Sequence, residues 1–256
     1  MSKSGEITCS SLVKTNGKSR TMDEIFQLAT GLKAEFEGEG ASREQIAREF
    51  ALSCKHDIEY LVKIGGCEAK TDIAYLESIG INSLTAPMIE TEFAMQKFMS
   101  AIKSRRFSHI GVTIETKTAV KNIHEILEIG DLLTNVTVGR SDLSLSMGGI
   151  GAMADQITDS VAHVATAVRA RGLEMTVGGS ICIETRELFR NNTRLAELVS
   201  FIETRKVVMP MEQFLIDGVL EKALAFELSI LETDALYLEG QIITNNNRIE
   251  ALKARL

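Results

Sequence analysis

Two segments in the middle of the chain decide the fold: His109-Ile-Gly-Val-Thr-Ile-Glu115 and Leu133-Thr-Asn-Val-Thr-Val-Gly139-Arg-Ser-Asp142. Both are rich in β-branched residues, and the first alternates apolar and polar positions, as β-strands do. The segment between them, Lys117 to Ile129, carries apolar residues at helical spacing: Val120, Ile123, Ile126 and Leu127. Together they predict a strand-helix-strand unit with parallel strands.

Each of these strands ends in a carboxylate, Glu115 in the first and Asp142 in the second. Parallel neighbours bring their carboxyl ends to the same edge of a sheet, so the two side chains should lie close together. Paired carboxylates repel unless a cation lies between them, and oxygen ligands suit a hard ion such as Mg²⁺ or Mn²⁺. Acidic residues also end strands simply as turn residues or helix caps, and that interpretation stays open for either residue alone.

The motifs Val112-Thr-Ile-Glu115-Thr and Val138-Gly-Arg-Ser-Asp142-Leu-Ser144, followed by Ser146-Met-Gly148, resemble the metal-binding motifs of the HpcH/HpaI aldolase/citrate lyase family. That family belongs to the phosphoenolpyruvate/pyruvate barrel superfamily. Two earlier segments, Tyr60 to Gly65 and Leu84 to Thr91, resemble the preceding strands of the same barrels. The chain is therefore identified as a divergent member of this family.

The resemblance implies an α/β fold, a (β/α)₈ TIM barrel, and a metal-dependent carbon–carbon lyase or aldolase. Its substrate would be a 2-oxo acid or a related acyl-CoA, and the reaction would pass through a pyruvate-type enolate stabilised by Mg²⁺ or Mn²⁺. Glu115 and Asp142 would hold the metal. The residues implied to bind substrate are Gly139, Arg140, Ser141 and Pro87. Arg140 could pair either with an anionic substrate or with Asp142.

Two positions depart from the family pattern. Lys63 stands where the family has an Arg that supports the enolate oxygen, and the segment Phe36 to Gly40 lacks the His of aldolase members. Lys63 and Glu37 are then the candidate catalytic residues, because both fall at predicted carboxyl ends of strands. Two alternatives follow: Lys63 could form a Schiff base with a carbonyl, or the chain could be a non-catalytic or assembly subunit that binds a small oxo acid.

Strands and helices alternate along the chain, and a glycine-rich phosphate loop, expected in a doubly wound sheet, is missing after the first strand. The predicted strands are Ile7 to Val13, Leu32 to Glu37, Glu59 to Ile64, Ile81 to Met88, His109 to Glu115, Leu133 to Val138, Glu174 to Val177 and one within Leu198 to Met209. Eight strands with intervening helices is the count of a (β/α)₈ barrel.

Composition favours small-molecule chemistry in the cytoplasm. The net charge of −7, with acids and bases interleaved, provides no basic surface for nucleic acid or acidic lipid. No apolar run is long enough for a membrane span, and no signal sequence is evident. The four cysteines lack metal-ligand or disulfide spacing, so we expect reduced thiols.

The last part of the chain differs from the rest. From Leu224 to Leu256, apolar residues and Asn245 follow strict four-three spacing, which is the seam of a coiled coil. An ordinary helix covering the barrel, broken near Gly240 or at Thr244 to Asn247, is the alternative. We predict a barrel over residues 1–211 and C-terminal helices over residues 212–256. These helices are the expected contact of a homo-oligomer, since members of the resembled family exchange C-terminal helices between subunits.

Overall fold

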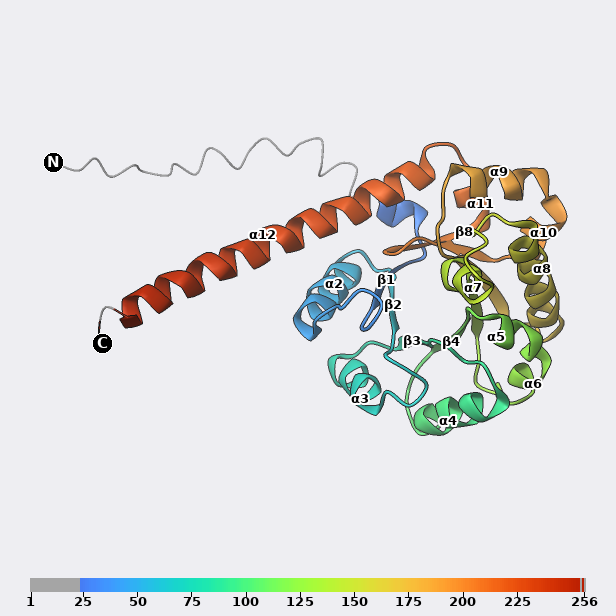
Figure 1. The fold of residues 1–256 in the computed structure, drawn as a ribbon, viewed down its shortest axis with the longest axis horizontal. Helices are drawn as coiled ribbons and strands as arrows, with labels where there is room; N and C mark the ends of the chain where they lie inside the picture. The colour runs from blue at the N-terminus through green and yellow to red at the C-terminus, as the bar shows by residue number, and fades with distance from the viewer. Residues whose placement is uncertain (1–23, 254, 256) are drawn as a thin grey trace.

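The computed structural model of the protein describes residues 24–253 and Arg255. Eight strands close into a barrel in sequence order, with helices around the outside (Figure 1). The strands are β1 (Gly31–Glu35), β2 (Glu59–Lys63), β3 (Ser83–Ala86), β4 (His109–Ile114), β5 (Asn135–Gly139), β6 (Glu174–Gly178), β7 (Phe201–Glu203) and β8 (Val207–Pro210). The predicted α/β barrel is confirmed. The predicted strand Ile7 to Val13 lies outside the described residues.

Each strand alternates between two surroundings. Apolar side chains such as Ala34, Val62 and Val138 point outward from the barrel. They are completely buried in the main hydrophobic core, between the strands and the surrounding helices. The intervening side chains point into the barrel because successive residues of a strand face opposite sides. Many of these inward residues are polar yet buried: Lys33, Ser83, Thr85, Thr113, Asn135, Thr137, Thr176 and Glu203. The interior of the barrel is therefore polar, and this polar lining continues to the charged groups at the carboxyl ends of the strands.

The helices follow from local sequence signals. Ser42, Thr91 and Thr116 cap three of them, each accepting a backbone N–H bond with its side-chain oxygen. The helices that follow the strands are α2 (Arg43–Lys55), α3 (Lys70–Ile79), α4 (Glu92–Ile102), α5 (Lys117–Lys121), α6 (Ile123–Glu128), α7 (Arg140–Ser146), α8 (Asp155–Ala170), α9 (Ile183–Asn191), α10 (Thr193–Leu198) and α11 (Met211–Phe214).

The end of the barrel differs from the prediction. Residues Leu198 to Met209 hold parts of two strands rather than one, because β7 turns back directly into β8 through Thr204, Arg205 and Lys206. β8 runs antiparallel to both β7 and β1, so the last unit is a hairpin and not a strand with a crossover helix. The hairpin brings its turn to the same end of the barrel as the carboxyl ends of the parallel strands.

A single long helix, α12 (Val219–Lys253), ends the described chain. It continues through Gly240 and through Thr244 to Asn247, where a break was considered possible. Its first turns pack on the barrel, and the remainder runs past α2 and out from the body of the molecule (Figure 1). Within the described part of the chain, no helix is both long and apolar enough to cross a membrane.

Candidate active site

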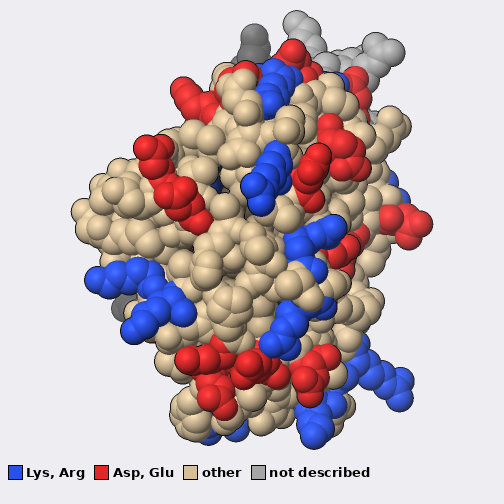
Figure 2. All heavy atoms as spheres, turned by 90° about the vertical axis from the view of Figure 1, so that its right-hand side faces the viewer, with Lys and Arg blue, Asp and Glu red and all other residues tan. Residues whose placement is uncertain are grey.

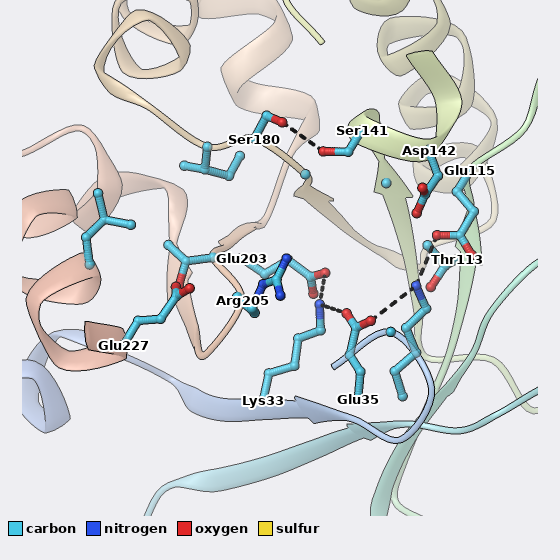
Figure 3. A pocket seen from close by; sticks show the side chains of 17 residues that line it. Lys33, Glu35, Thr113, Glu115, Ser141, Asp142, Ser180, Glu203, Arg205 and Glu227 are labelled. Atoms are coloured by element: carbon cyan, nitrogen blue, oxygen red, sulfur yellow. Dashed lines mark hydrogen bonds and ion pairs between the residues drawn. The ribbon is translucent and has the colours of Figure 1, made fainter. Parts of the chain in front are cut away.

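A cavity of about 530 Å³ opens at the carboxyl ends of the strands (Figure 3). Charged side chains from β1, β2, β7 and the segments after β4 and β5 converge on it, and Leu224 and Glu227 of α12 form one side. A second lobe, of about 510 Å³, lies on the side of Pro87 and Glu37. The two lobes share five lining residues, which stand between them: Glu35, Gly38, Lys63, Glu115 and Asp142.

Glu115 and Asp142 lie as the sequence pattern predicts, side by side at the mouth (Figure 3). Glu115 follows β4, is 2 % exposed, and accepts a hydrogen bond from the backbone N–H of Met88 at 3.0 Å. Asp142 lies in the first turn of α7, directly after β5. Burial raises the pKa of Glu115, and the charge of Asp142 adds to the rise, although Lys63 opposes it. A further cation here would offset the repulsion between the two carboxylates.

Lys63, the last residue of β2, lies against both neighbouring strand ends. Its ammonium is 3.0 Å from Glu115 Oε2 and 3.7 Å from Glu35 Oε2. Glu35 is paired with Lys63 in the register of β1 and β2, which explains why the two meet. Lys63 is therefore held between two carboxylates, at the point where the two lobes of the cavity join.

Lys33, Glu35 and Glu203 extend this row of charges and were not identified from the sequence. The Lys33 ammonium lies 2.6 Å from Glu203 Oε1 and 2.9 Å from Glu35 Oε1. Although burial opposes it, attraction to Glu203 and Glu35 raises the pKa of Lys33, which stays charged. Burial also acts against ionisation of Glu35, yet Lys33 and Lys63 lower its pKa below the usual value. Positive and negative groups thus alternate from Glu203 to Glu115.

Glu37 and Pro87 occupy only the second lobe. The second predicted strand, Leu32 to Glu37, corresponds to β1, but β1 ends at Glu35, and Glu37 lies exposed in the following turn. Pro87 directly follows β3. The next residue, Met88, has a φ of 55°, a left-handed conformation that is uncommon outside glycine, and it aims its N–H at Glu115. The turn after β3 therefore orients the buried carboxylate.

Arg140 does not take either of the positions considered for it. Its side chain is buried, and its guanidinium donates to the carbonyl oxygens of Gly179 and Ser180 at 2.9 and 3.1 Å and to Thr185 Oγ1 at 3.0 Å. It lines neither lobe. Burial lowers its pKa to about 10. Arg140 thus fastens the loop after β6 to the start of α7, and we correct its expected substrate contact.

That fastened loop shapes a small recess beside Asp142. Gly179 has a φ of 80°, and a Cβ there would lie 2.5 Å from the backbone nitrogen of Ser141. Only glycine leaves this space open. Ser141 and Ser180, whose hydroxyls are 2.8 Å apart, border the recess (Figure 3). A Cβ on Gly139 would meet Glu115 Oε2 at 3.1 Å, so this glycine permits the close approach of the two strand ends.

Arg205, in the turn between β7 and β8, reaches the cavity from the side opposite Asp142 (Figure 3). Among the described residues it forms no ion pair, although its charge contributes to the lowered pKa of Glu35. The sequence predicts one strand within Leu198 to Met209 and therefore no turn that would bring Arg205 to the mouth. All four histidines lie in the described chain, and none lines either lobe.

The donor set fits one class of metal. Among the described residues, no group of three or more His, Cys, Asp or Glu side chains is placed to hold an ion, so a closed protein cage is absent. Glu115 and Asp142 offer two carboxylates with an open cavity before them. Mg²⁺ is commonly bound by one or two carboxylates, with water and substrate oxygens as its other ligands. The pair fits Mg²⁺ or Mn²⁺ bound together with a substrate.

A model of the HpcH/HpaI aldolase/citrate lyase family matches residues 45–213, well over half of the chain. The chain belongs to this family. Membership supports a lyase at the level of reaction class. The match covers Lys63, Glu115 and Asp142, and it also includes the hairpin that carries Arg205. No curated protein sequence matches the chain.

Solved structures share the fold at low sequence identity. An HpcH/HpaI aldolase from Desulfitobacterium hafniense DCB-2 has a TM-score of 0.61 and 14% identity, over 73% of this chain and 81% of that one. The citrate synthase SbnG has a TM-score of 0.60 and 15% identity, over 85% and 89%. A citrate lyase beta subunit from M. tuberculosis, complexed with oxaloacetate and magnesium, has a TM-score of 0.53 and 15% identity, over 79% and 99%.

Proposed function

We propose that this protein is a metal-dependent carbon–carbon lyase or aldolase that acts on a 2-oxo acid, or a related acyl-CoA, through a pyruvate-type enolate. The observation that carries the proposal is the Glu115 and Asp142 pair, which stands at adjacent strand ends between two lobes of one cavity. The family is one of aldolases and citrate lyases. A magnesium ion with oxaloacetate in the M. tuberculosis citrate lyase subunit supports the choice of metal and substrate class.

Glu115 and Asp142 would hold Mg²⁺ or Mn²⁺, which supplies a Lewis acid for the negative charge that develops on the 2-oxo oxygen. Lys63 contributes a fixed positive charge at the same place, because two carboxylates keep its ammonium between the lobes. The recess formed by Gly139, Ser141 and Ser180 would take the substrate carboxylate. These groups are held by strand ends and by the loop that Arg140 fastens, so the site is preorganised.

The two lobes provide separate places for the two products of bond cleavage. The 2-oxo acid would lie over the shared residues, and the other product would leave on the side of Pro87 and Glu37. In that cleavage a base takes the proton of the substrate hydroxyl, the carbon–carbon bond breaks, and its electron pair passes to the 2-oxo fragment. Glu37 is our candidate base, because no histidine lines either lobe and its carboxylate is exposed there.

Exchange of the methyl protons of pyruvate in D₂O tests this function without knowledge of the second product. NMR of pyruvate with the protein and Mg²⁺ should show loss of the methyl signal, and Asp142→Asn should abolish the exchange. Protonated Glu37 would return its proton to the enolate carbon after cleavage, and exchange runs through this same transfer, so Glu37→Gln should slow it by about 10²–10⁴-fold. Glu174→Gln, at the opposite end of the barrel, is the control and should exchange normally. Binding of pyruvate without exchange would favour the alternative, a non-catalytic subunit that binds an oxo acid.

A further inference from the structure

The coiled-coil seam predicted for the C-terminal segment is a continuous apolar stripe on the surface of α12. Most of its apolar members are large and at least two-fifths exposed: Leu224, Leu228, Leu231, Leu238, Ile242, Ile249 and Leu252. Every described residue from 235 to 253 is exposed. A stripe of this length on a free surface marks an interaction site.

Beyond Leu224, the barrel does not cover this stripe. α12 docks through Ala223 and Phe226, which are buried, and through Ile230, which is partly buried against the core. Asp234 continues the docked face with an ion pair to Arg48 of α2 at 2.8 Å, and Tyr237 ends it with its ring under the Arg48 guanidinium. At about 100° per residue, the docked positions are turned by roughly 100° or more from the seam positions beside them. Beyond Leu224, which borders the cavity, the seam is therefore not covered by its own barrel.

The outer half of α12 also lacks the local support that a lone helix needs. Gly240 lies within it, and Thr244 to Asn247 is a run of weak helix formers. In proteins, most of the stability of a helix comes from packing of an apolar face and not from the propensity of its residues. Since the docked face ends at Tyr237, a partner on the seam is the remaining source of that packing.

The charges beside the seam identify the partner. Flanking positions are acidic in the first half, namely Glu227, Glu232, Asp234 and Glu239, and basic in the second half, namely Arg248, Lys253 and Arg255. In a parallel pair of identical helices, each flanking residue meets the one five positions later on the other helix. Glu227 would then face Glu232, and Arg248 would face Lys253. A parallel pair is therefore repulsive at both ends, while the middle pair, Gln241 and Asn246, is uncharged.

We infer that α12 binds α12 of a second copy of this chain as an antiparallel two-stranded coiled coil. Reversal places the acidic half of each helix beside the basic half of the other. When Ala235 packs against Leu252 of the second copy, Glu232 faces Lys253 and Asp234 faces Arg255. The same register seats Leu238 against Ile249 and Ile242 against Asn245. Because α12 also forms one side of the cavity through Leu224 and Glu227, the coil would fix the helix that borders the proposed active site.

A lipid surface fits α12 less well. The helix carries more acidic than basic side chains, and anionic lipid attracts amphipathic helices that are rich in Lys and Arg. The acidic and basic residues that flank the seam are also separated along the helix and not gathered on one polar face. This lengthwise separation is what an antiparallel copy of the same helix complements.

Two adjacent residues give a matched test of the seam. Ile242 lies in the seam and Ile243 lies beside it, and their side chains are 60% and 55% exposed. Sedimentation equilibrium of the full chain should show self-association that Ile242→Asp weakens by about 100-fold or more, because the symmetric pair loses two buried isoleucines. Ile243→Asp should change it by less than about threefold. Circular dichroism should show the barrel intact in both. A monomeric wild-type chain, or equal effects of the two variants, would overturn the inference.

Reversing one charge tests the orientation. In the antiparallel pair, Lys253→Glu places like charges opposite Glu232 and should weaken association by about tenfold, while Glu232→Lys with Lys253→Glu should restore it to within about threefold. In a parallel pair, Lys253→Glu would relieve the repulsion with Arg248 and strengthen association. Strengthening by Lys253→Glu, or failure of the double variant to recover, would overturn the antiparallel arrangement.

Discussion

At the scale of single residues, the site depends on how each carboxylate of the mouth is compensated. Glu35 has two lysines within 4 Å, whereas Glu115 has Lys63 and the nearby charge of Asp142. Their pKa values consequently move in opposite directions, down for Glu35 and up for Glu115. Glu35 thus helps to stabilise the fold. The ionised form of Glu115 is disfavoured by burial and by Asp142, and a bound cation would stabilise it.

This difference predicts opposite effects on stability. A lowered folded-state pKa means that Glu35 contributes stability above its ordinary pKa of 4.5, and that this stability is lost as pH falls through the folded value. Glu35→Gln should therefore lower the free energy of unfolding at pH 7 by about 1–3 kcal/mol. The raised pKa of Glu115 means that its ionised form costs stability at pH 7. Glu115→Gln should therefore leave the free energy of unfolding unchanged or raise it. Urea unfolding without added metal measures both, and equal losses would contradict the assignment.

Lys63 has two possible roles that leave different chemical traces. As a fixed charge between Glu35 and Glu115, it should be partly replaced by Lys63→Arg and lost in Lys63→Met, and EDTA should abolish all activity. Borohydride reduction with pyruvate should then trap nothing. Mass spectrometry that found a covalent adduct on Lys63 would support the Schiff-base alternative and overturn the electrostatic role.

The sequence predicted Glu115, Asp142 and Lys63 because each stands at the end of a strand with clear alternation. It missed Lys33, Glu35 and Glu203, although Lys33 and Glu35 are two residues apart and so face the same side. This two-residue spacing is visible in the sequence, but the predicted strand runs to Glu37 and so places the carboxyl end of β1 two residues too late. Arg140 was misassigned because its local sequence gives no sign that the loop after β6 accepts its guanidinium.

At the scale of elements, the hairpin of β7 and β8 brings a residue to the mouth that a crossover helix would not. Its turn carries Arg205 to the side of the cavity opposite Asp142. We predicted a single strand here because two strands of three and four residues give too little periodicity to separate them. The hairpin is therefore visible only in the structure, through the antiparallel pairing of β7 with β8.

Arg205 lines the cavity and forms no ion pair with another described residue, so its guanidinium is available to a second carboxylate of the substrate. We therefore predict a preference for substrates that carry one. Arg205→Gln should raise KM for such substrates by about tenfold or more, because a charge-assisted hydrogen bond is lost. Exchange of pyruvate methyl protons should change by less than about twofold, since pyruvate has only one carboxylate. Arg194→Gln, on the exposed face of α10, is the control. Equal effects on both classes of substrate would contradict this role for Arg205.

At the scale of the whole molecule, the charges are distributed in two ways. On the face shown in Figure 2, acidic and basic side chains are interspersed, with no broad basic patch for nucleic acid. At the mouth of the barrel they are concentrated and ordered, from Glu203 through Lys33, Glu35 and Lys63 to Glu115. This concentration of charge in one partly enclosed place is what marks the mouth as the chemical site.

The central claim is that Glu115 and Asp142 together hold one divalent ion. Calorimetric titration of Mn²⁺ into the full chain tests it most directly, with Glu115→Gln, Asp142→Asn and the control Glu174→Gln titrated in parallel. We predict one site per chain in the wild type and the control, tighter in the presence of oxalate, and no binding in either carboxamide variant. Mn²⁺ binding that persists unchanged in both variants would contradict the account and leave the two carboxylates as structural turn residues.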